Sequence, residues 1–293
     1  MSPSPGKVIP TVIAVRLLSF VVALLLPPAA GTAARLEPAR PGERVVIIAP
    51  HIDDEGLAAG GYASDAIAAG ADVHIVYITA GDHSRTALAV NRLTGFATAR
   101  WNRKGQRRMR EAHRVTEGIG LDAENLTLLG YPDRGLRRML RNPHLSVRSA
   151  STGKRAVPYL DALSPGAEYR LENVLADLRE VLESIRPDIV IAPLAEDRHP
   201  DHRAAALLVH RALGDLGLTP IRLGYIIHTR SIHAHARADR PDGDWVSYAL
   251  TPATVEKKRE MLAGYRSQRR SPYLRFLFGR SRGPQEVFLR YDG

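Results

Sequence analysis

The sequence of 293 residues contains no cysteine. This absence excludes a disulfide framework and thiolate metal sites, so any metal must be held by His, Asp, Glu or backbone oxygen. The chain also lacks internal repeats and has no low-complexity stretch in its middle. One large domain is therefore favoured over two small ones. No aromatic-interleaved nucleic-acid motif is present, and we expect no nucleic-acid partner.

Positive charge exceeds negative charge, with 41 Lys and Arg against 31 Asp and Glu and a formal net charge of +10. Arginine is concentrated in three segments, residues 100–114, 134–148 and 266–282. A basic surface attracts anionic polymers, membrane headgroups or nucleic acid. An arginine-rich composition with solvated faces explains the same numbers, and the composition does not separate these two interpretations.

Residues 1–34 have the layout of a secretory signal peptide. The basic residues Lys7 and Arg16 precede an apolar core at 17–26, and small residues follow at 29–34. This core is shorter than the roughly 20 residues that span a bilayer. We therefore expect a secreted protein whose mature domain is 35–293. The alternative is an uncleaved, membrane-anchored extracytoplasmic form that contacts the membrane only through this segment.

Apolar runs alternate with amphipathic segments along the rest of the chain. We expect strands at 45–48, 73–79, 126–129, 188–192 and 221–227, and helices at 55–70, 105–118, 171–185, 201–213 and 252–265. This alternation predicts an α/β fold, a Rossmann-like three-layer α/β/α arrangement with a mostly parallel central sheet. The weakly periodic segment 141–168 is expected to be a long loop, either bordering an active site or without a role.

Two clusters of histidine and acidic residues follow predicted strands. The first is His51-Ile52-Asp53-Asp54-Glu55, and the second is His199-Pro200-Asp201-His202. Open α/β sheets bind their ligands at the carboxyl ends of the strands, so the two clusters together suggest one metal site. Taken alone, the first cluster could be helix capping and the second could be a simple turn.

His51, Asp54 and His202 are candidate metal ligands. Two imidazoles, one carboxylate and an open position suit catalytic zinc, and the same set could hold ferrous iron. A metal bound in this way acidifies water and polarises a carbonyl group.

The remaining residues of the two clusters are candidate catalytic groups. Asp53 is adjacent to Asp54, so its side chain points elsewhere and could act as general base. His199 could face the same cavity and stabilise an oxyanion. Asp201 could hydrogen-bond a histidine and fix its protonation.

The two motifs together resemble those of the PIG-L/LmbE-like family of metal-dependent de-N-acetylases. Residues 50–55 stand where that family has Ala-His-Pro-Asp-Asp-Glu, and residues 199–202 match its His-x-Asp-His motif. Segments 79–82, 108–111, 129–133 and 265–268 are also similar to family segments. Pro50 replaces the usual alanine and Ile52 the usual proline, and neither change removes a ligand.

The resemblance implies a role for each matching residue. His51, Asp54 and His202 would be the zinc ligands. Asp53 would be the general base that later protonates the leaving amine. His199 would stabilise the oxyanion, with Asp201 as its hydrogen-bond partner. Candidate substrate-binding residues are Arg108 and Asp133, which match positions that hold sugar hydroxyls, and also Asp82 and His228.

We therefore expect a secreted zinc-dependent hydrolase that removes the N-acetyl group from an N-acetylglucosamine-type sugar, glycolipid or glycan. One alternative is a metal-dependent hydrolase of another acyl amide or of a phosphoester. A second alternative is a basic glycan-binding protein with a vestigial site. The sequence does not identify the molecule that bears the acetyl group.

Overall fold

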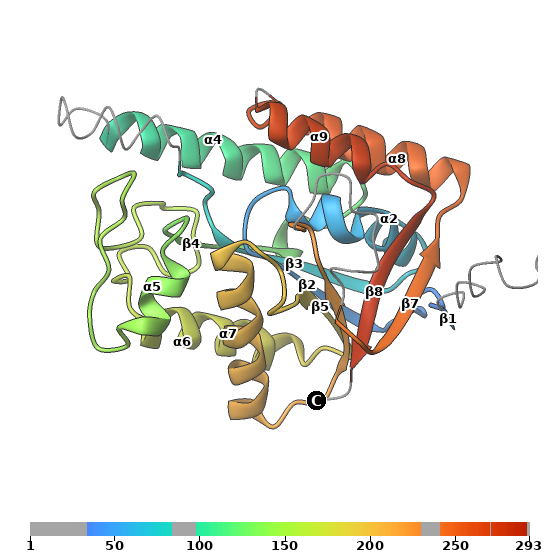
Figure 1. Ribbon diagram of the computed structural model, residues 1–293, viewed down its shortest axis with the longest axis horizontal. Coiled ribbons are helices and arrows are strands. Elements are labelled where there is room, and N and C mark those ends of the chain that lie inside the picture. The colour runs from blue at the N-terminus through green and yellow to red at the C-terminus, as the bar shows by residue number, and fades with distance from the viewer. Residues whose placement is uncertain (1–33, 84–97, 230–240, 270, 292–293) are drawn as a thin grey trace, which may run out of the picture. The chain divides into compact units, whose positions relative to one another are not determined.

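The alternating segments fold into one eight-stranded sheet with helices on both faces (Figure 1). A computed structural model describes residues 34–83, 98–229, 241–269 and 271–291. Residues 34–293 form one compact unit. Residues 1–33, on which the signal-peptide prediction rests, lie outside the described residues.

Five strands form the parallel part of the sheet, in the order β4-β3-β2-β5-β6. They are β2 (Arg44–Ala49), β3 (Asp72–Thr79), β4 (Leu126–Tyr131), β5 (Ile189–Pro193) and β6 (Ile221–Tyr225). In the central register, Val46 of β2 lies opposite His74 of β3 and Val190 of β5. The strand β2 is thus covered on both edges, and residues 45–49 are completely buried.

Three further strands extend the sheet beyond β6. The strand β8 (Gln285–Tyr291) pairs antiparallel with both β6 and β7 (Asp244–Ala249), and β1 (Ala34–Arg35) pairs parallel with β7. The sheet is therefore mostly parallel, as the sequence predicts. The antiparallel pairing of β8 with β6 and β7 was not predicted. The alternating burial of β7 and β8 is typical of strands with one solvated face, which leaves only a weak apolar signal.

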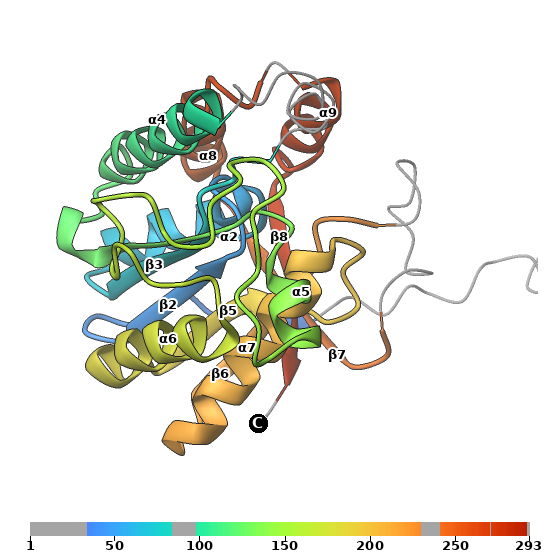
Figure 2. The same ribbon diagram turned by 90° about the vertical axis from the view of Figure 1, so that its left-hand side faces the viewer.

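The helices form a layer on each side of the sheet (Figure 2). On one side α2 (Asp54–Ala68), α4 (Thr98–Glu117) and α8 (Pro252–Gly264) pack together. On the other side are α5 (Leu136–Arg141), α6 (Leu171–Ile185) and α7 (Pro200–Leu216). The helix α9 (Pro272–Arg280) lies on the α8 side, and the short helix η1 (Ala123–Asn125) leads into β4. The predicted α/β/α layering is confirmed.

Two predicted boundaries can be compared with the structure in detail. The basic helix was expected to begin at Gly105, but α4 begins at Thr98, and Gly105 lies inside it. A Cβ on Gly105 would come within 2.3 Å of the Tyr159 hydroxyl, so this glycine allows close packing and does not begin the helix. The segment 141–168 is mostly irregular after α5, as expected, with one isolated bridge between Ala156 and Glu168. Within the described ranges, no helix is long and apolar enough to cross a membrane.

A buried ion pair interrupts α2, the helix that begins at the first cluster. The helix is kinked at Ala59, whose φ and ψ are −140° and 18°. Just after the kink, the Gly61 and Tyr62 amides donate to the two Glu286 carboxylate oxygens, both at 2.8 Å. Lys258 Nζ, which pairs with Glu286, donates to the Leu57 carbonyl at 3.3 Å. The Lys258–Glu286 pair thus fixes α2 between α8 and β8.

Replacing Lys258 should test the contribution of this pair to stability. Lys258→Met leaves the Glu286 carboxylate buried without its counter-charge, so we expect the free energy of unfolding to fall by about 3 kcal/mol. Urea denaturation followed by circular dichroism measures this change. The control is Lys257→Met, at an exposed neighbour on α8, which should change stability by about 0.5 kcal/mol or less. Equal denaturation midpoints for the two variants would contradict the assignment.

Candidate metal centre

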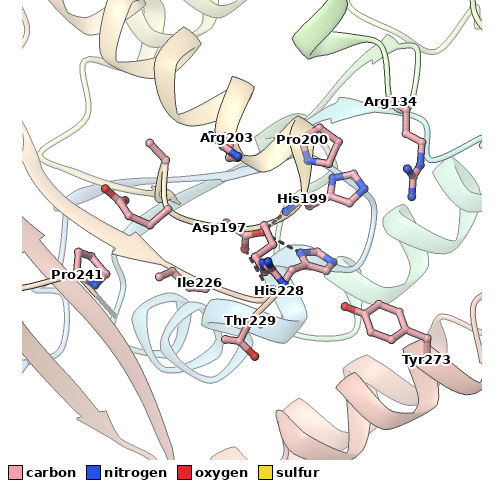
Figure 3. Close-up of a pocket in the computed structure, with 13 residues that line it drawn as sticks. Arg134, Asp197, His199, Pro200, Arg203, Ile226, His228, Thr229, Pro241 and Tyr273 are labelled. Atoms are coloured by element: carbon pink, nitrogen blue, oxygen red, sulfur yellow. Dashed lines mark hydrogen bonds and ion pairs between the residues drawn. The ribbon is translucent and has the colours of Figure 1, made fainter. Parts of the chain in front are cut away.

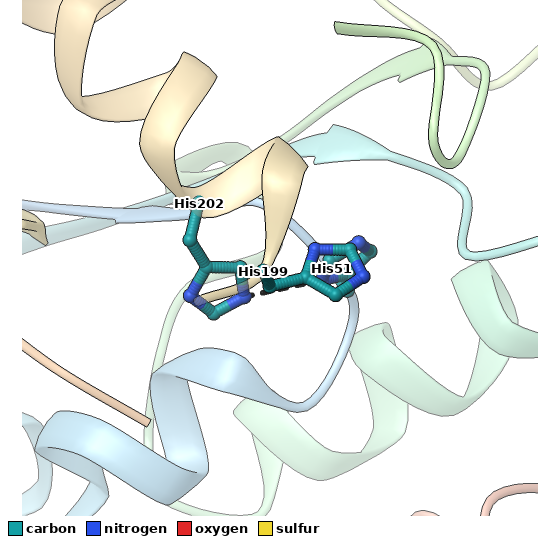
Figure 4. Close-up of side chains that lie close together, drawn as sticks. All are labelled: His51, His199 and His202. Atoms are coloured by element: carbon teal, nitrogen blue, oxygen red, sulfur yellow. Dashed lines mark hydrogen bonds between the residues drawn. The ribbon is translucent and has the colours of Figure 1, made fainter. Parts of the chain in front are cut away.

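The two clusters meet where the chain direction around the sheet reverses. The strands β2 and β5 are neighbours, but the chain continues from β2 to β3 on one side and from β5 to β6 on the other. Such a switch point leaves a crevice at the carboxyl ends of the two strands. The first cluster follows β2 and the second follows β5, and Figure 4 shows His51, His199 and His202 converging there. The predicted meeting of the two motifs is confirmed.

The three predicted ligands present atoms at the spacing that a single metal ion requires. Asp54 Oδ2 lies 3.0 Å from His51 Nδ1 and 3.0 Å from His202 Nε2. The two imidazole nitrogens are 3.3 Å apart. Zinc bonds of 2.0–2.1 Å in a tetrahedral site place neighbouring ligand atoms about 3.3 Å apart. His202 is 0% exposed and Asp54 is 2% exposed, so these atoms converge in a buried site that fits a divalent cation.

At least one carboxylate lies next to the outer ring nitrogen of each of the two histidines. His51 Nε2 is 3.4 Å from Asp201 Oδ2 and 3.6 Å from Asp133 Oδ1. His202 Nδ1 is 3.2 Å from Asp197 Oδ2. In metal sites, the second nitrogen of a ligating histidine usually donates to such a carboxylate, which fixes the ring and raises its basicity. The arrangement leaves His51 Nδ1 and His202 Nε2 free to act as ligands.

Asp197 is a residue of the site that the sequence analysis missed. Its carboxylate accepts backbone N–H bonds from His199 at 2.8 Å, Ile227 at 2.9 Å and His228 at 3.1 Å. It also contacts His228 Nδ1 at 3.1 Å. Asp197 therefore joins the loop after β5 to the end of β6 and orients His202. Only its position shortly after β5 could have indicated it, because Ala195-Glu196-Asp197 matches no motif.

The electrostatics of the ligand atoms favour a cation at their centre. Burial lowers the pKa of His202, but Asp197 and Asp54 outweigh this effect and raise that pKa to about 9. Burial likewise opposes the charged form of His51, and Asp54 and Asp133 raise its pKa well above the usual value. Burial acts against the Asp54 carboxylate, yet His202 and His51 hold its pKa well below normal. A metal that binds here must displace protons from both imidazoles.

Asp53 is held apart from these ligands by an unusual backbone conformation. It caps α2 with φ at 128°, in the region where residues other than glycine are strained. Its N–H donates to Glu55 Oε2 at 3.2 Å. Burial raises the pKa of Asp53 well above normal, although Arg108 opposes this from 3.6 Å. Asp53 Oδ2 is buried without a hydrogen-bond partner, as expected of a carboxylate that meets a substrate or water.

Glu55 connects this turn to α8. The Tyr265 hydroxyl donates to Glu55 Oε1, and the Tyr77 hydroxyl is 3.2 Å from that of Tyr265. Burial raises the pKa of Glu55 to about 7. All three side chains are completely buried. Glu55 thus supports the strained conformation of Asp53. Its position at the start of a helix did not reveal this role in the sequence.

Arg108 lies under the same turn. Its guanidinium donates to the carbonyls of Gly81 and Ile52, both at 2.6 Å, and to the Gln268 side chain. Gly81 has φ at 59°, and a Cβ there would lie 2.1 Å from Arg108 Nη1. The Ile52 carbonyl also accepts from Gln268, so two buried side chains hold the turn that lacks the usual proline. Sugar binding by Arg108 stays a prediction.

His199 is oriented by the start of α7. It caps this helix, and its Nδ1 accepts the Asp201 N–H at 3.3 Å, so in the neutral ring the proton lies on Nε2. Burial, followed by the charges of His51 and His202, lowers the pKa of His199 to about 2. The predicted contact with Asp201 is thus made by the Asp201 backbone, while its carboxylate faces His51 and the Arg134 N–H.

A cavity of about 980 Å³ opens beside the ligand atoms. Asp197, His199, His228 and Tyr273 are among the residues that line it, with Tyr273 stacked on His228 (Figure 3). His228, one of the predicted substrate-binding residues, thus lines the cavity, and its contact with substrate stays a prediction.

The other two predicted substrate residues, Asp82 and Asp133, form a second polar group. Asp82 Oδ2 accepts from the Tyr159 hydroxyl at 3.2 Å, and Asp133 Oδ2 accepts the His83 N–H at 3.3 Å. Burial and the charge of Asp133 raise the pKa of Asp82 to about 7. Tyr159 belongs to segment 141–168, so this loop borders the site. Asp82 Oδ1 is buried without a partner, which suits a hydrogen bond to a ligand.

Comparison with known proteins points to one family. The model of the PIG-L family, described as GlcNAc-PI de-N-acetylase, matches residues 46–213. A curated relative is the 1D-myo-inositol 2-acetamido-2-deoxy-alpha-D-glucopyranoside deacetylase of Corynebacterium glutamicum (strain R). It is 27% identical over 177 residues, covering 59% of this chain and 54% of the relative. The chain thus spans about half the length of the curated relatives it matches.

Solved structures share the fold. The deacetylase–teicoplanin complex from the biosynthesis pathway of teicoplanin has a TM-score of 0.56 at 17% identity, covering 85% of this chain and 98% of that one. The 4-carboxy-2-hydroxymuconate hydratase GalB of Pseudomonas putida KT2440 has a TM-score of 0.52 at 15% identity, covering 85% and 95%. Because a deacetylase and a hydratase are similarly close, the fold alone does not identify the reaction.

The role of Asp197 can be tested by metal binding. Asp197→Asn keeps the shape of the side chain and one oxygen that accepts backbone N–H bonds, but it removes the charge next to His202, so zinc affinity should fall about 10- to 100-fold. Competition with a chromogenic chelator measures this affinity. Glu196→Gln removes the same charge from the exposed neighbouring position and should bind zinc like the unmodified protein. Asp197→Asn with undiminished affinity would rule out this orienting role.

Proposed function

This chain belongs to the PIG-L family, described as GlcNAc-PI de-N-acetylase, and from that premise we propose that it is a metal-dependent N-deacetylase. The observation that supports this most strongly is the convergence of His51 Nδ1, Asp54 Oδ2 and His202 Nε2 within 3.0–3.3 Å, next to an unpartnered Asp53 oxygen. The reaction would be hydrolysis of an amide to acetate and a free amine.

Zinc is the metal that we propose, because two imidazoles and a carboxylate with an open position are its usual catalytic ligand set. Ferrous iron accepts the same ligands and is the alternative. His51, Asp54 and His202 would hold the ion, with Asp201 and Asp197 fixing the two rings. When bound, it would supply a Lewis acid that polarises the amide carbonyl and lowers the pKa of water.

In the proposed mechanism Asp53 is the general base. Its raised pKa makes the carboxylate a stronger base, and Oδ2 is available to accept a proton from the attacking water. The oxygen of that water attacks the amide carbon, and the carbonyl becomes an oxyanion. Protonated Asp53 then gives the proton to the amine nitrogen as the carbon–nitrogen bond breaks.

His199 is the proposed oxyanion stabiliser. Its Nδ1 is occupied by the Asp201 N–H, so the neutral ring can donate from Nε2. Its ring lies 4.6 Å from that of His51, between the ligand atoms and the cavity that it lines. A donor fixed at this position stabilises charge that develops on the carbonyl oxygen without having to reorient.

We propose an N-acetylglucosamine-type sugar, glycolipid or glycan as the substrate. The family description and the curated relative both name N-acetylated glucosamine compounds. The 980 Å³ cavity is large enough for a sugar with part of its aglycone. The basic, apolar and small-residue order of residues 1–34 supports a secreted or membrane-anchored extracytoplasmic location.

Acetate release tests the proposed function. The full chain is incubated with a panel of N-acetylglucosamine compounds, untreated, with a chelator, and with chelator followed by added zinc or ferrous iron. We expect release that the chelator abolishes and one of the two metals restores. Undiminished release after removal of all metal would contradict metal dependence. Release from no compound by stoichiometrically loaded protein would contradict the deacetylase and favour another acyl or phosphoryl substrate.

Asp53→Asn separates the general base from the metal ligands. Asparagine shares the backbone preferences of aspartate and keeps the shape of the side chain, but it cannot accept the proton. We expect kcat to fall by about a thousandfold with unchanged metal content, as measured by acetate release and by elemental analysis.

Two further variants complete this test. His202→Ala removes a ligand, so it should lose both the metal and the activity. Asp161→Asn, in the exposed part of segment 141–168, makes the same chemical change as Asp53→Asn and should keep both. An Asp53→Asn enzyme with more than a tenth of the normal kcat would exclude Asp53 as the base.

A further inference from the structure

Three arginines line the cavity beside the proposed metal centre, and neither the mechanism nor the family motifs use them. They are Arg134, Arg198 and Arg203. Arg198 and Arg203 flank the His199–His202 motif in the sequence, and Arg134 follows β4. In the view of Figure 3, Arg203 lies to the left of His199 and Arg134 to its right, and Tyr273 lies below Arg134. Three arginine side chains thus line one cavity.

The three arginines outnumber the two acidic side chains that line the cavity. Within residues 34–83, 98–229, 241–269 and 271–291, no ion pair joins Arg134, Arg198 or Arg203 to an acidic side chain. Two acidic side chains also line the cavity, the exposed Glu196 and the buried Asp197, and Asp197 is paired with His202 and His228. Elsewhere on the surface, arginines form ion pairs with carboxylates, as in the Arg179–Asp215 pair at 2.7 Å. Three arginines against two carboxylates, one of which is paired with histidines, leave an excess of positive charge on the cavity wall.

The backbone at Arg134 is an independent indication of function. Arg134 has φ at 62°, in the left-handed region, and its N–H donates to the Asp201 carboxylate. Glycine or asparagine would form this turn with less strain. Strained residues persist where surrounding contacts fix them, and they are concentrated at ligand sites. Here the strain places a guanidinium at the cavity, anchored to the same carboxylate that faces His51.

We propose that Arg134, Arg198 and Arg203 bind an oxyanion of the substrate, a phosphate or a carboxylate separate from the acetamido group. The preferred substrate is then an anionic N-acetyl sugar derivative, an inference that rests on the proposed deacetylase function. Guanidinium groups bind such oxyanions with paired, charge-assisted hydrogen bonds. Tyr273, which is 47% exposed and stacked on His228, offers an aromatic face across the cavity for the rest of the ligand.

The first test compares substrates that differ in charge. The value of kcat/KM is measured with the full-length, metal-loaded protein for N-acetylglucosamine, N-acetylglucosamine 1-phosphate and N-acetylmuramic acid. We expect at least one anionic compound to be preferred, with a preference that falls as salt is added. The phosphate and the carboxylate compounds distinguish the two sources of the anion. Equal kcat/KM for the neutral and both charged compounds at low salt would overturn the proposal.

Arg203→Gln should then reduce the ratio of anionic to neutral kcat/KM about tenfold, because a charge-assisted contact is lost. The matched control is Arg211→Gln, which removes the same charge from an exposed position two turns further along α7, outside the cavity lining. It should leave the ratio unchanged. Equal ratios for the two variants would contradict a specific role for Arg203.

The second test does not depend on activity. Isothermal titration calorimetry measures the binding of inorganic phosphate to the full chain and to the Arg198→Gln, Arg203→Gln and Arg211→Gln variants. We expect the first two variants to bind about tenfold more weakly and Arg211→Gln to bind normally. Arginine-dependent phosphate binding without any deacetylation would support the anion site and reject the proposed function. Deacetylation with phosphate binding that is the same in all variants would do the reverse.

Discussion

A single oxygen atom, Asp54 Oδ2, joins the two halves of the site. It contacts one imidazole that follows β2 and another that follows β5, each at 3.0 Å, and it accepts the His51 N–H at 2.8 Å. A buried carboxylate surrounded by nitrogen donors is stable only if cations or protons compensate its charge. The remaining site groups are arranged around this requirement. Asp201 and Asp133 face the outer nitrogen of His51, and Asp197 faces that of His202.

Asp53 and Asp54 have different proposed roles, general base and metal ligand, and this difference depends on the backbone conformation at Asp53. Adjacent carboxylates would otherwise compete for one cation, and the positive φ of Asp53 separates them. This conformation is supported by side chains from distant parts of the chain. Arg108 comes from α4, whereas Tyr265 and Gln268 follow α8. The kink of α2, closed by Lys258 and Glu286, ties the same helix to the antiparallel end of the sheet. The local strain is therefore offset by contacts across one whole layer.

The sequence predicts the layers and the position of the site because both depend on local patterns. Buried parallel strands are continuous apolar runs, and motifs at the ends of β2 and β5 must meet in a sheet of this order. The strands β7 and β8 were missed because one of their faces is solvated and their alternation is short. Asp197 was missed for another reason. Its role comes from contacts with β6 and α7, and its neighbours in the sequence do not indicate them.

Some predicted residues have positions that the sequence could not define. Arg108 is found beneath the Asp53 turn, bound to backbone carbonyls, because Gly81 leaves room for its guanidinium. The Asp201 carboxylate faces His51, since its own N–H already occupies His199 Nδ1. Such details follow from the direction of side chains in a folded site, which motif spacing does not specify.

The most direct test of this account is anomalous X-ray diffraction from crystals of the zinc-loaded protein, collected on both sides of the zinc absorption edge. The account predicts one buried zinc ion bonded to His51 Nδ1, Asp54 Oδ2 and His202 Nε2 at roughly 2.0–2.2 Å. Zinc bonded instead to His51 Nε2 with Asp133 and Asp201, which also lie close enough together to hold an ion, would contradict it.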